Sequence, residues 1–193
     1  MHLSGIPHTA GNYAPQATYE GDNNVLCLQT ARYLLKALRA AAAGKKPVGQ
    51  TAYLGEPLRA SSTLASSTGS ALRSTAPLRA AFEHRAARLA RQAAERMASA
   101  KLSDEAGFQV FMVDWIKAAK AHCAYVVLDN FAQGVAEAPA HCSTAACAAL
   151  HRLLALHALT GIEDDLGDFL EDGFLSATQV GAALGCQRQQ RCL

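Results

Sequence analysis

Aromatic residues are scarce in this chain of 193 residues, where they make up 6% of the sequence against 50% for hydrophobic residues as a whole. Alanine is abundant, and it loses no side-chain entropy in a helix, whereas aromatic and β-branched residues suit strands better. No segment of useful length shows the alternation of a half-buried strand, and no fixed-period repeat is evident. The composition therefore predicts an all-α protein, long enough for one well-buried domain.

A strong excess of charge is also missing. The formal net charge is +2, which gives no electrostatic footprint for nucleic acid or for an anionic membrane. The most hydrophobic region is too short to span a bilayer because four charged residues interrupt it: Lys117, Lys120, Asp129 and Glu137. Residues 1–7 have neither a basic start nor an apolar stretch, so no signal peptide is predicted. We expect a soluble protein without membrane insertion and without a nucleic-acid partner.

Cys-x-x-Cys pairs are absent, although the chain has six cysteines: Cys27, Cys123, Cys142, Cys147, Cys186 and Cys192. A chain this large and apolar does not need disulfides, so we interpret them as reduced, partly buried thiols. A zinc site is the alternative, formed by residues close in sequence: His141, Cys142, Cys147 and His151. The flanking alanines offer no carboxylate to orient the histidines, so no metal site is predicted.

The first third of the chain is predicted to contain one helix. Residues 1–21 hold several glycines and prolines, which indicates an irregular loop. A helix should begin at residues 22–24, where Asp and Asn can cap it, and should end near Gly44. Its buried face is predicted from apolar spacing: Leu28, Ala31, Leu35, Leu38 and Ala42. Residues 44–76, rich in Ser, Thr and Gly, are predicted to be a surface connection.

A second long helix is predicted to begin at Thr75, with Pro77 in its first turn. Three-and-four spacing marks one apolar face: Leu78, Phe82, Ala86, Leu89, Ala93 and Met97. Arginines fill much of the remaining surface: Arg79, Arg85, Arg88, Arg91 and Arg96. We interpret this arginine face as a solvated surface with ion pairs to nearby glutamates, and an anion site is the alternative.

The rest of the chain is predicted to add further helices. Ser103 can cap a third helix that runs to about residue 135, with a broad apolar stripe: Phe108, Phe111, Met112, Trp115, Ile116, Ala119, Cys123, Val126, Val127 and Phe131. A fourth helix is predicted from residues 143–144 to a stop at Gly161. In the acidic segment 163–173 we expect three buried residues: Leu166, Phe169 and Leu170. Residues 176–179 have capping-box spacing and can open one more helix. The predicted architecture is a helical bundle.

Residues 18–36 carry the most distinctive motif, Thr-Tyr-Glu-Gly-Asp-Asn-Asn-Val-Leu-Cys-Leu-Gln-Thr-Ala-Arg-Tyr-Leu-Leu-Lys. This segment is similar to the one around the catalytic glutamate of acyl-CoA oxidases, flavoenzymes of fatty-acid β-oxidation. Asn24 replaces the family's usual threonine, and asparagine caps a helix equally well. Further stretches resemble the family in the same order: residues 3–13, 85–89, 121–127, 156–161, 167–170 and 173–176.

The resemblance implies a helical bundle like the C-terminal helical domains of acyl-CoA oxidase. Residues 1–43 would be the end of the dehydrogenase-like helical domain, with the catalytic-base loop and its helix. Residues 44–76 would be a connecting loop, and residues 77–185 an incomplete oxidase C-terminal helical domain. Residues 186–193 would form a polar tail. By this interpretation the chain is a fragment of a complete enzyme.

The resemblance also implies roles for individual residues. Glu20 matches the catalytic base, which removes the α-proton of a fatty acyl-CoA while hydride passes to FAD. Because that proton is weakly acidic, the base must be close, desolvated and raised in pKa. Gly21 matches a substrate-binding position where a bare backbone lets the thioester approach closely. Asn23 either lies near the cofactor or serves only as a helix cap.

No Gly-x-Gly-x-x-Gly turn or other flavin-holding framework is evident, so we expect the isolated chain neither to retain FAD nor to oxidise acyl-CoA. The family implies a homodimer in the complete enzyme and a peroxisomal location, although the terminal Arg-Cys-Leu departs from the usual targeting signal. An acyl-CoA dehydrogenase would share the base chemistry, but the long extension over 85–175 argues against it. The other alternative is a non-catalytic helical module that pairs with full-length oxidase subunits.

Overall fold

The computed structural model describes residues 5–15, 23–58, 72 and 74–191. Its helical segments follow in chain order: α1 (Ile6–Tyr13), α3 (Asn23–Ala42), the 3-10 helix η1 (Gly49–Gly55), α5 (Thr75–Ser99), α6 (Asp104–Val110), α7 (Met112–Glu137), the 3-10 helix η3 (Ala138–Ala140), α8 (Thr144–Asp164), α9 (Leu166–Leu170) and α10 (Ala177–Arg191). No strand occurs in these described ranges, which confirms the predicted all-α bundle.

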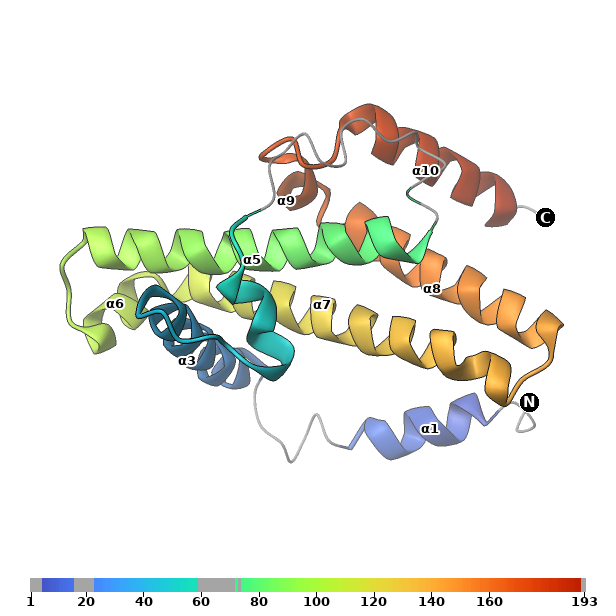
Figure 1. Ribbon diagram of the computed structural model, residues 1–193, viewed down its shortest axis with the longest axis horizontal. Helices are drawn as coiled ribbons and strands as arrows, with labels where there is room; N and C mark the ends of the chain where they lie inside the picture. Colours follow the sequence, from blue (N-terminus) through green and yellow to red (C-terminus); the bar gives the residue numbers. More distant parts are fainter. Residues whose placement is uncertain (1–4, 16–22, 59–71, 73, 192–193) are drawn as a thin grey trace.

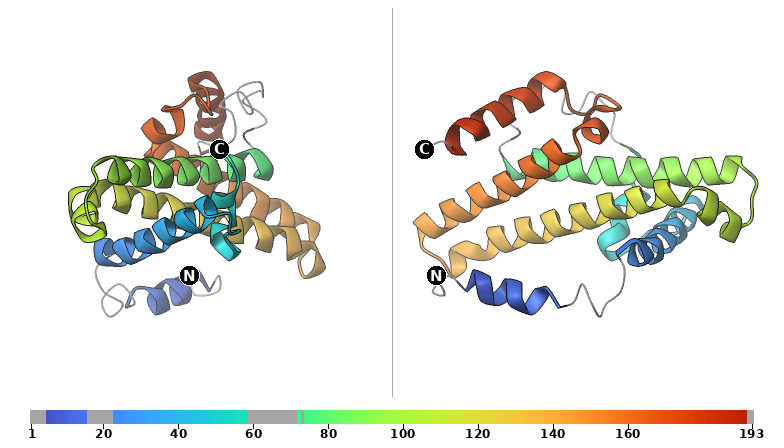
Figure 2. Two further views of the ribbon diagram at one scale, coloured as in Figure 1. Left: turned by 60° about the vertical axis from the view of Figure 1, so that its left-hand side comes forward. Right: turned by 180° about the vertical axis from the view of Figure 1, so that it is seen from behind.

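Helices α5 and α7 form the centre of the bundle and run antiparallel, joined by the short α6 (Figure 1). Helix α3 packs across α7, and α8 returns alongside α7 toward α5 (Figures 1 and 2). Helices α9 and α10 lie on the outer side of α5 and α8 (Figure 2). The predicted apolar face of α5 is buried as expected, and Trp115 of α7 is completely buried.

Four helix ends follow the capping chemistry predicted from the sequence. The Oγ atoms of Ser103 and Ser143 accept hydrogen bonds from the backbone amides of Ala106 and Ala146, which start α6 and α8. At α10, the backbone N–H of Gln179 donates to Ser176 Oγ over 3.2 Å. The backbone N–H of Ser176 donates to Gln179 Oε1 over 2.8 Å, which completes a capping box. After α3, Gly44 has φ of 74°, the left-handed conformation that glycine adopts without strain.

The loop predicted for residues 1–21 is wrong for residues 6–13, which form helix α1. Pro7 stands at the first helical turn, where its missing N–H breaks no hydrogen bond, and Gly5 before it has φ of 70°. All side chains of residues 7–15 are exposed, and α1 lies at the margin of the bundle (Figure 2). Glycine and proline therefore indicated the helix start here rather than its absence.

The surface connection predicted for residues 44–76 is wrong for the part that forms η1. Thr51, Tyr53 and Leu54 of η1 are buried, and so is Leu72. Arg91 of α5 donates to the backbone carbonyl of Leu54 over 3.1 Å, which holds η1 against the bundle. Two apolar residues next to each other gave no helical periodicity in the sequence, so the prediction missed this buried turn.

The single helix predicted for residues 103–135 is broken at Phe111, whose φ of −102° and ψ of 24° are not helical. The break brings the rings of Phe108 and Trp115 to 5.2 Å between centroids. It also brings Gly107 against Met97, where an added Cβ would meet the methionine side chain at 2.7 Å. Three residues of the predicted stripe are exposed rather than buried: Met112, Cys123 and Val127.

The stop predicted at Gly161 is also wrong, because α8 continues to Asp164. Gly161 faces Phe82 of α5, and an added Cβ would lie 3.0 Å from the phenyl Cζ. A glycine at this position inside α8 therefore lets the helix pack closely on Phe82 of α5. In the acidic segment Phe169 is buried as predicted and Leu170 partly so, but Leu166 is 38% exposed.

Helix α8 is the only described helix whose length and composition would allow it to cross a membrane. Only 22% of its most apolar window is buried, although α8 packs on α7, α5 and α10.

Candidate functional site

The residues predicted to carry the chemistry lie at and before the start of α3. Glu20 and Gly21 fall outside the described residues. Asn23 is the first residue of α3 and is exposed, so the predicted helix start is confirmed. In this region the structure therefore describes only the helix that follows the predicted base.

Helix α3 is held by its buried face. Ala31 and Leu34 are completely buried against the core, and α3 packs on α7, η1 and α5. The guanidinium of Arg32 lies 5.3 Å from the ring centroid of Phe108, a cation–π contact with α6. Apolar burial and this contact fix α3 relative to α5, α6 and α7.

An exposed ion pair joins the other end of α3 to α6. Both guanidinium nitrogens of Arg39 donate to the Asp104 carboxylate, over 2.6 and 2.7 Å. This hydrogen bonding lowers the pKa of Asp104 below its usual value. Because both side chains are about half exposed, we expect solvent to screen the pair, and apolar contacts rather than this pair to hold α3.

A buried polar cluster links η1, α5 and α7. The hydroxyl of Tyr53 lies 2.9 Å from His122 Nδ1, and the Tyr53 ring packs edge-on against Tyr125 at 5.0 Å. The Tyr125 hydroxyl donates to Glu83 Oε2 over 3.2 Å. Burial raises the pKa of Tyr53 well above its usual range and that of Tyr125 to about 12, and it lowers the pKa of His122. Both tyrosines therefore stay protonated near neutral pH.

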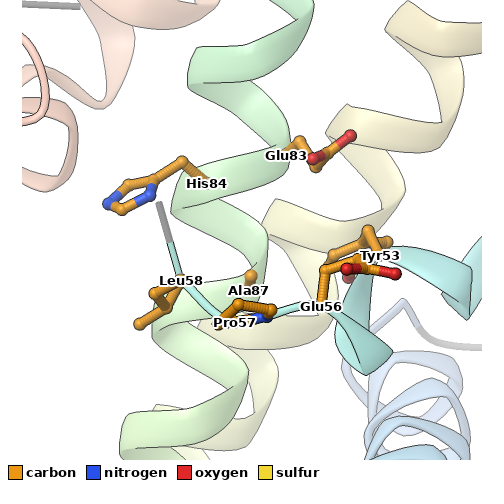
Figure 3. A pocket seen from close by; sticks show the side chains of 7 residues that line it. All are labelled: Tyr53, Glu56, Pro57, Leu58, Glu83, His84 and Ala87. Atoms are coloured by element: carbon orange, nitrogen blue, oxygen red, sulfur yellow. The ribbon is translucent and has the colours of Figure 1, made fainter. Parts of the chain in front are cut away.

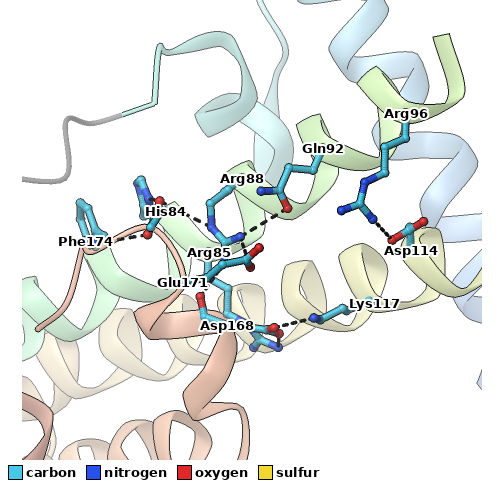
Figure 4. Close-up of polar contacts among 11 residues, drawn as sticks. His84, Arg85, Arg88, Gln92, Arg96, Asp114, Lys117, Asp168, Glu171 and Phe174 are labelled. Atoms are coloured by element: carbon cyan, nitrogen blue, oxygen red, sulfur yellow. Dashed lines mark hydrogen bonds and ion pairs between the residues drawn. The ribbon is translucent and has the colours of Figure 1, made fainter. Parts of the chain in front are cut away.

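Two arginines of the predicted solvated face are in fact buried. Arg85 and Arg88 are each 4% exposed, and Figure 4 shows both beside the acidic residues of the segment after α8. Arg85 contacts the carboxylates of Asp165 at 2.8 Å and of Asp168 at 2.9 Å. Arg88 lies 2.5 Å from the Glu171 carboxylate. The interpretation as a solvated surface is wrong for these two residues, because the acidic segment after α8 folds back over α5.

The same acidic segment takes up further donors from α5 and α7. Lys117 Nζ lies 2.5 Å from Asp168, and His84 Nε2 lies 2.5 Å from Asp172 (Figure 4). Burial raises the pKa of both carboxyls, but several interactions together outweigh it: hydrogen bonds from Lys117 and Arg85 at Asp168, and hydrogen bonds from His84 and the Phe174 amide, with the charge of Arg88, at Asp172. The pKa values of Asp168 and Asp172 are lowered as a result. Both carboxylates are ionised at neutral pH. Asp168 holds α9 to α5 and α7, and Asp172 holds the turn after α9 to α5.

Outside this cluster, two further arginines of α5 pair with α7. Arg96 lies 2.6 Å from Asp114, and Arg79 pairs with Asp129. The partners are acids on another helix rather than the predicted partners, the glutamates on α5. For Arg85 and Arg88, the opposite charges of α5 and of segment 163–173 were visible in the sequence and could have indicated their pairing.

Three of the pockets lined by described residues can be compared with what FAD requires. FAD carries a pyrophosphate, which needs N–H donors or cations. Glu56 and Glu83 line one pocket of about 290 Å³ (Figure 3), and Asp129 lines another of about 160 Å³. An apolar groove of about 400 Å³ lies between α3, α5 and α6, where Arg39 is already bound to Asp104. In these three pockets the cations are therefore already paired, and none is left to bind a pyrophosphate.

The zinc alternative finds no support in the described part of the chain, which holds no group of three or more His, Cys, Asp or Glu residues able to bind a metal. The four cysteines with described side chains are free: Cys27, Cys123, Cys142 and Cys147. Cys123 and Cys142 are exposed, so the expectation of partly buried thiols is wrong for these two.

Family comparisons identify the chain. Residues 74–192 match the family model described as "Acyl-CoA oxidase", and residues 1–35 match that of the acyl-CoA oxidase C-alpha1 domain. The chain belongs to the acyl-CoA oxidase family. The predicted base and its neighbours fall within the C-alpha1 match, and α5 to α10 fall within the longer match.

Acyl-CoA oxidases of known structure share the fold. Acyl-CoA oxidase 1 of Arabidopsis thaliana matches with a TM-score of 0.80 and 33% identity over 92% of this chain and 27% of that one. Acyl-CoA oxidase-1 of Caenorhabditis elegans, solved in complex with FAD and ATP, matches with a TM-score of 0.75 and 28% identity over 89% of this chain and 26% of that one. Both matches support the helical arrangement described above.

Human peroxisomal acyl-coenzyme A oxidase 1 is 32% identical over 186 residues, which cover 93% of this chain and 28% of that protein. The chain thus spans a little over a quarter of the length of the curated acyl-CoA oxidases it matches. Family membership applies to nearly all of the chain, whereas most of each relative has no counterpart in it.

Proposed function

We propose that this chain supplies the catalytic base of an FAD-dependent acyl-CoA oxidase, which converts fatty acyl-CoA and O₂ into trans-2-enoyl-CoA and H₂O₂. The observation that carries the proposal is the C-alpha1 family match over residues 1–35, because it includes Glu20 within its motif. The family match over residues 74–192 supports it, since the same chain continues into the oxidase helical domain.

In this proposal Glu20 removes the proton from the α-carbon of the bound acyl-CoA. A carboxylate can do this when it is close to that carbon and shielded from water, which raises its pKa toward that of the substrate proton. Gly21 has no side chain, so the thioester can approach the backbone, and an amide N–H of Glu20 or Gly21 can donate to the thioester oxygen. Asn23 is proposed to lie near the flavin, or to act only as a cap.

The helix that follows the base supports this assignment. Helix α3 begins three residues after Glu20, and its buried face is fixed by α7, η1 and α5. A rigid element next to a catalytic group limits the error in its position, and errors of about 1 Å cost roughly 100-fold in rate. The described part of the chain is thus proposed to orient the base, while FAD is held by other parts of a complete enzyme.

The names of the relatives extend the proposal to location and assembly. Several are called peroxisomal acyl-coenzyme A oxidase 1, from Homo sapiens to Arabidopsis thaliana. We propose a peroxisomal location, a fatty acyl-CoA substrate and a homodimeric complete enzyme for this chain by the same family relationship.

A domain exchange tests the proposal. The matched segment of Arabidopsis thaliana acyl-CoA oxidase 1 is replaced by this chain, and FAD absorbance and H₂O₂ release from a fatty acyl-CoA are measured. The chimaera is expected to bind FAD and release H₂O₂, whereas the 193-residue chain alone does neither. A chimaera that holds FAD but releases no H₂O₂ would contradict the proposed function, and so would oxidase activity that persists when Glu20 is removed.

The second candidate is a non-catalytic helical module that pairs with full-length oxidase subunits. The exposed apolar side of α8 favours it, since Leu153 is 52% and Leu156 37% exposed. The test is co-purification of the tagged chain with a full-length acyl-CoA oxidase. Pairing through α8 predicts that Leu153→Glu abolishes co-purification while the matched surface variant Glu137→Lys on α7 does not, and equal recovery with both variants would count against it.

A further inference from the structure

We draw no further inference here: the strongest candidate, the apolar groove of about 400 Å³ between α3, α5 and the start of α6, carries none, because nothing in the structure shows what covers it.

Discussion

Helices α5 and α8 have similar lengths, 25 and 21 residues, but opposite relations between polarity and burial. Helix α5 carries five arginines, and yet most of its side chains between Leu78 and Ala93 are buried. Helix α8 is apolar enough to cross a membrane, and yet only four of its 21 side chains are buried: Leu154, Ala158, Leu159 and Ile162. Location in the bundle, rather than hydrophobicity, determines which helix is buried.

The contrast has a physical cause. A buried guanidinium is tolerated when carboxylates and carbonyl oxygens satisfy it, and segment 163–173 supplies these to Arg85 and Arg88. An apolar side chain on the surface costs little by itself, because much of any protein surface is apolar. The apolar side of α8 is thus compatible with this structure, and it is a candidate surface for contacts with other parts of a complete oxidase.

The largest expected difference between the two helices concerns packing. Phe82→Ala on α5 removes a side chain that is 3% exposed and contacts Phe169, so the free energy of unfolding should fall by about 3–5 kcal/mol. Leu153→Ala on α8 should change it by no more than about 0.5 kcal/mol. Urea denaturation of both variants measures the two values. Equal losses would show that Leu153 is buried in solution and would contradict the difference in burial between α5 and α8.

Next in size is the effect of the buried arginines. Arg85 pairs with both Asp165 and Asp168, and Arg85→Met would leave Lys117 as the only ion-pair partner of the Asp168 carboxylate in the described part of the chain. The free energy of unfolding should fall by about 2–3 kcal/mol. The loss is smaller than for a fully buried pair, because the other partner of Arg85, Asp165, is half exposed. Arg96→Met, which removes an exposed pair with Asp114, should cost at most about 1 kcal/mol. The same denaturation series checks both. A neutral Arg85→Met would mean that this pairing does not stabilise α9.

The pairing also predicts a dependence on pH. Since the pKa of Asp168 is lowered in the folded protein, its contribution is fully present above the unfolded value of about 4 and is lost as pH falls through the lowered pKa. The urea concentration at the unfolding midpoint of the wild type should therefore decrease when the pH falls below about 4. Asp168→Asn should be less stable at pH 7 and should lose less on acidification, whereas Glu137→Gln should follow the wild type. Parallel wild-type and Asp168→Asn curves would exclude this contribution.

Two glycine substitutions should change the free energy of unfolding least, and in opposite directions. Gly161→Ala places a Cβ 3.0 Å from Phe82, between α8 and α5, and should cost about 1 kcal/mol. Gly134→Ala on α7 meets no atom within 4 Å and should gain about 0.5–1 kcal/mol from helix propensity. Thermal unfolding of the two variants shows the sign. A stabilising Gly161→Ala would mean that α8 does not pack closely on α5.

The sequence predicted local features better than contacts between distant segments. Ser103, Ser143 and the capping box at Ser176 were identified correctly, because capping depends on residues three positions apart. The break at Phe111 and the continuation past Gly161 were missed, since each depends on a side chain from another helix. Arg85 was placed in solvent for the same reason.

For the candidate site the balance is different. Glu20, Gly21 and Asn23 were identified by resemblance to a family motif, and they remain predictions about chemistry. Family membership itself is confirmed. Neither periodicity nor composition indicates a catalytic base, because a glutamate before a helix is common in any structure. Only its position in a motif marks Glu20 out.

The most direct test of the account is flavin reduction in the chimaera of Arabidopsis thaliana acyl-CoA oxidase 1 that carries this chain. Glu20→Gln is compared with the unsubstituted chimaera by anaerobic stopped-flow absorbance after mixing with a fatty acyl-CoA. We expect both proteins to bind FAD equally and Glu20→Gln to slow flavin reduction by about 10²–10⁴-fold, the usual contribution of a general base. Flavin reduction at an unchanged rate in Glu20→Gln would contradict it.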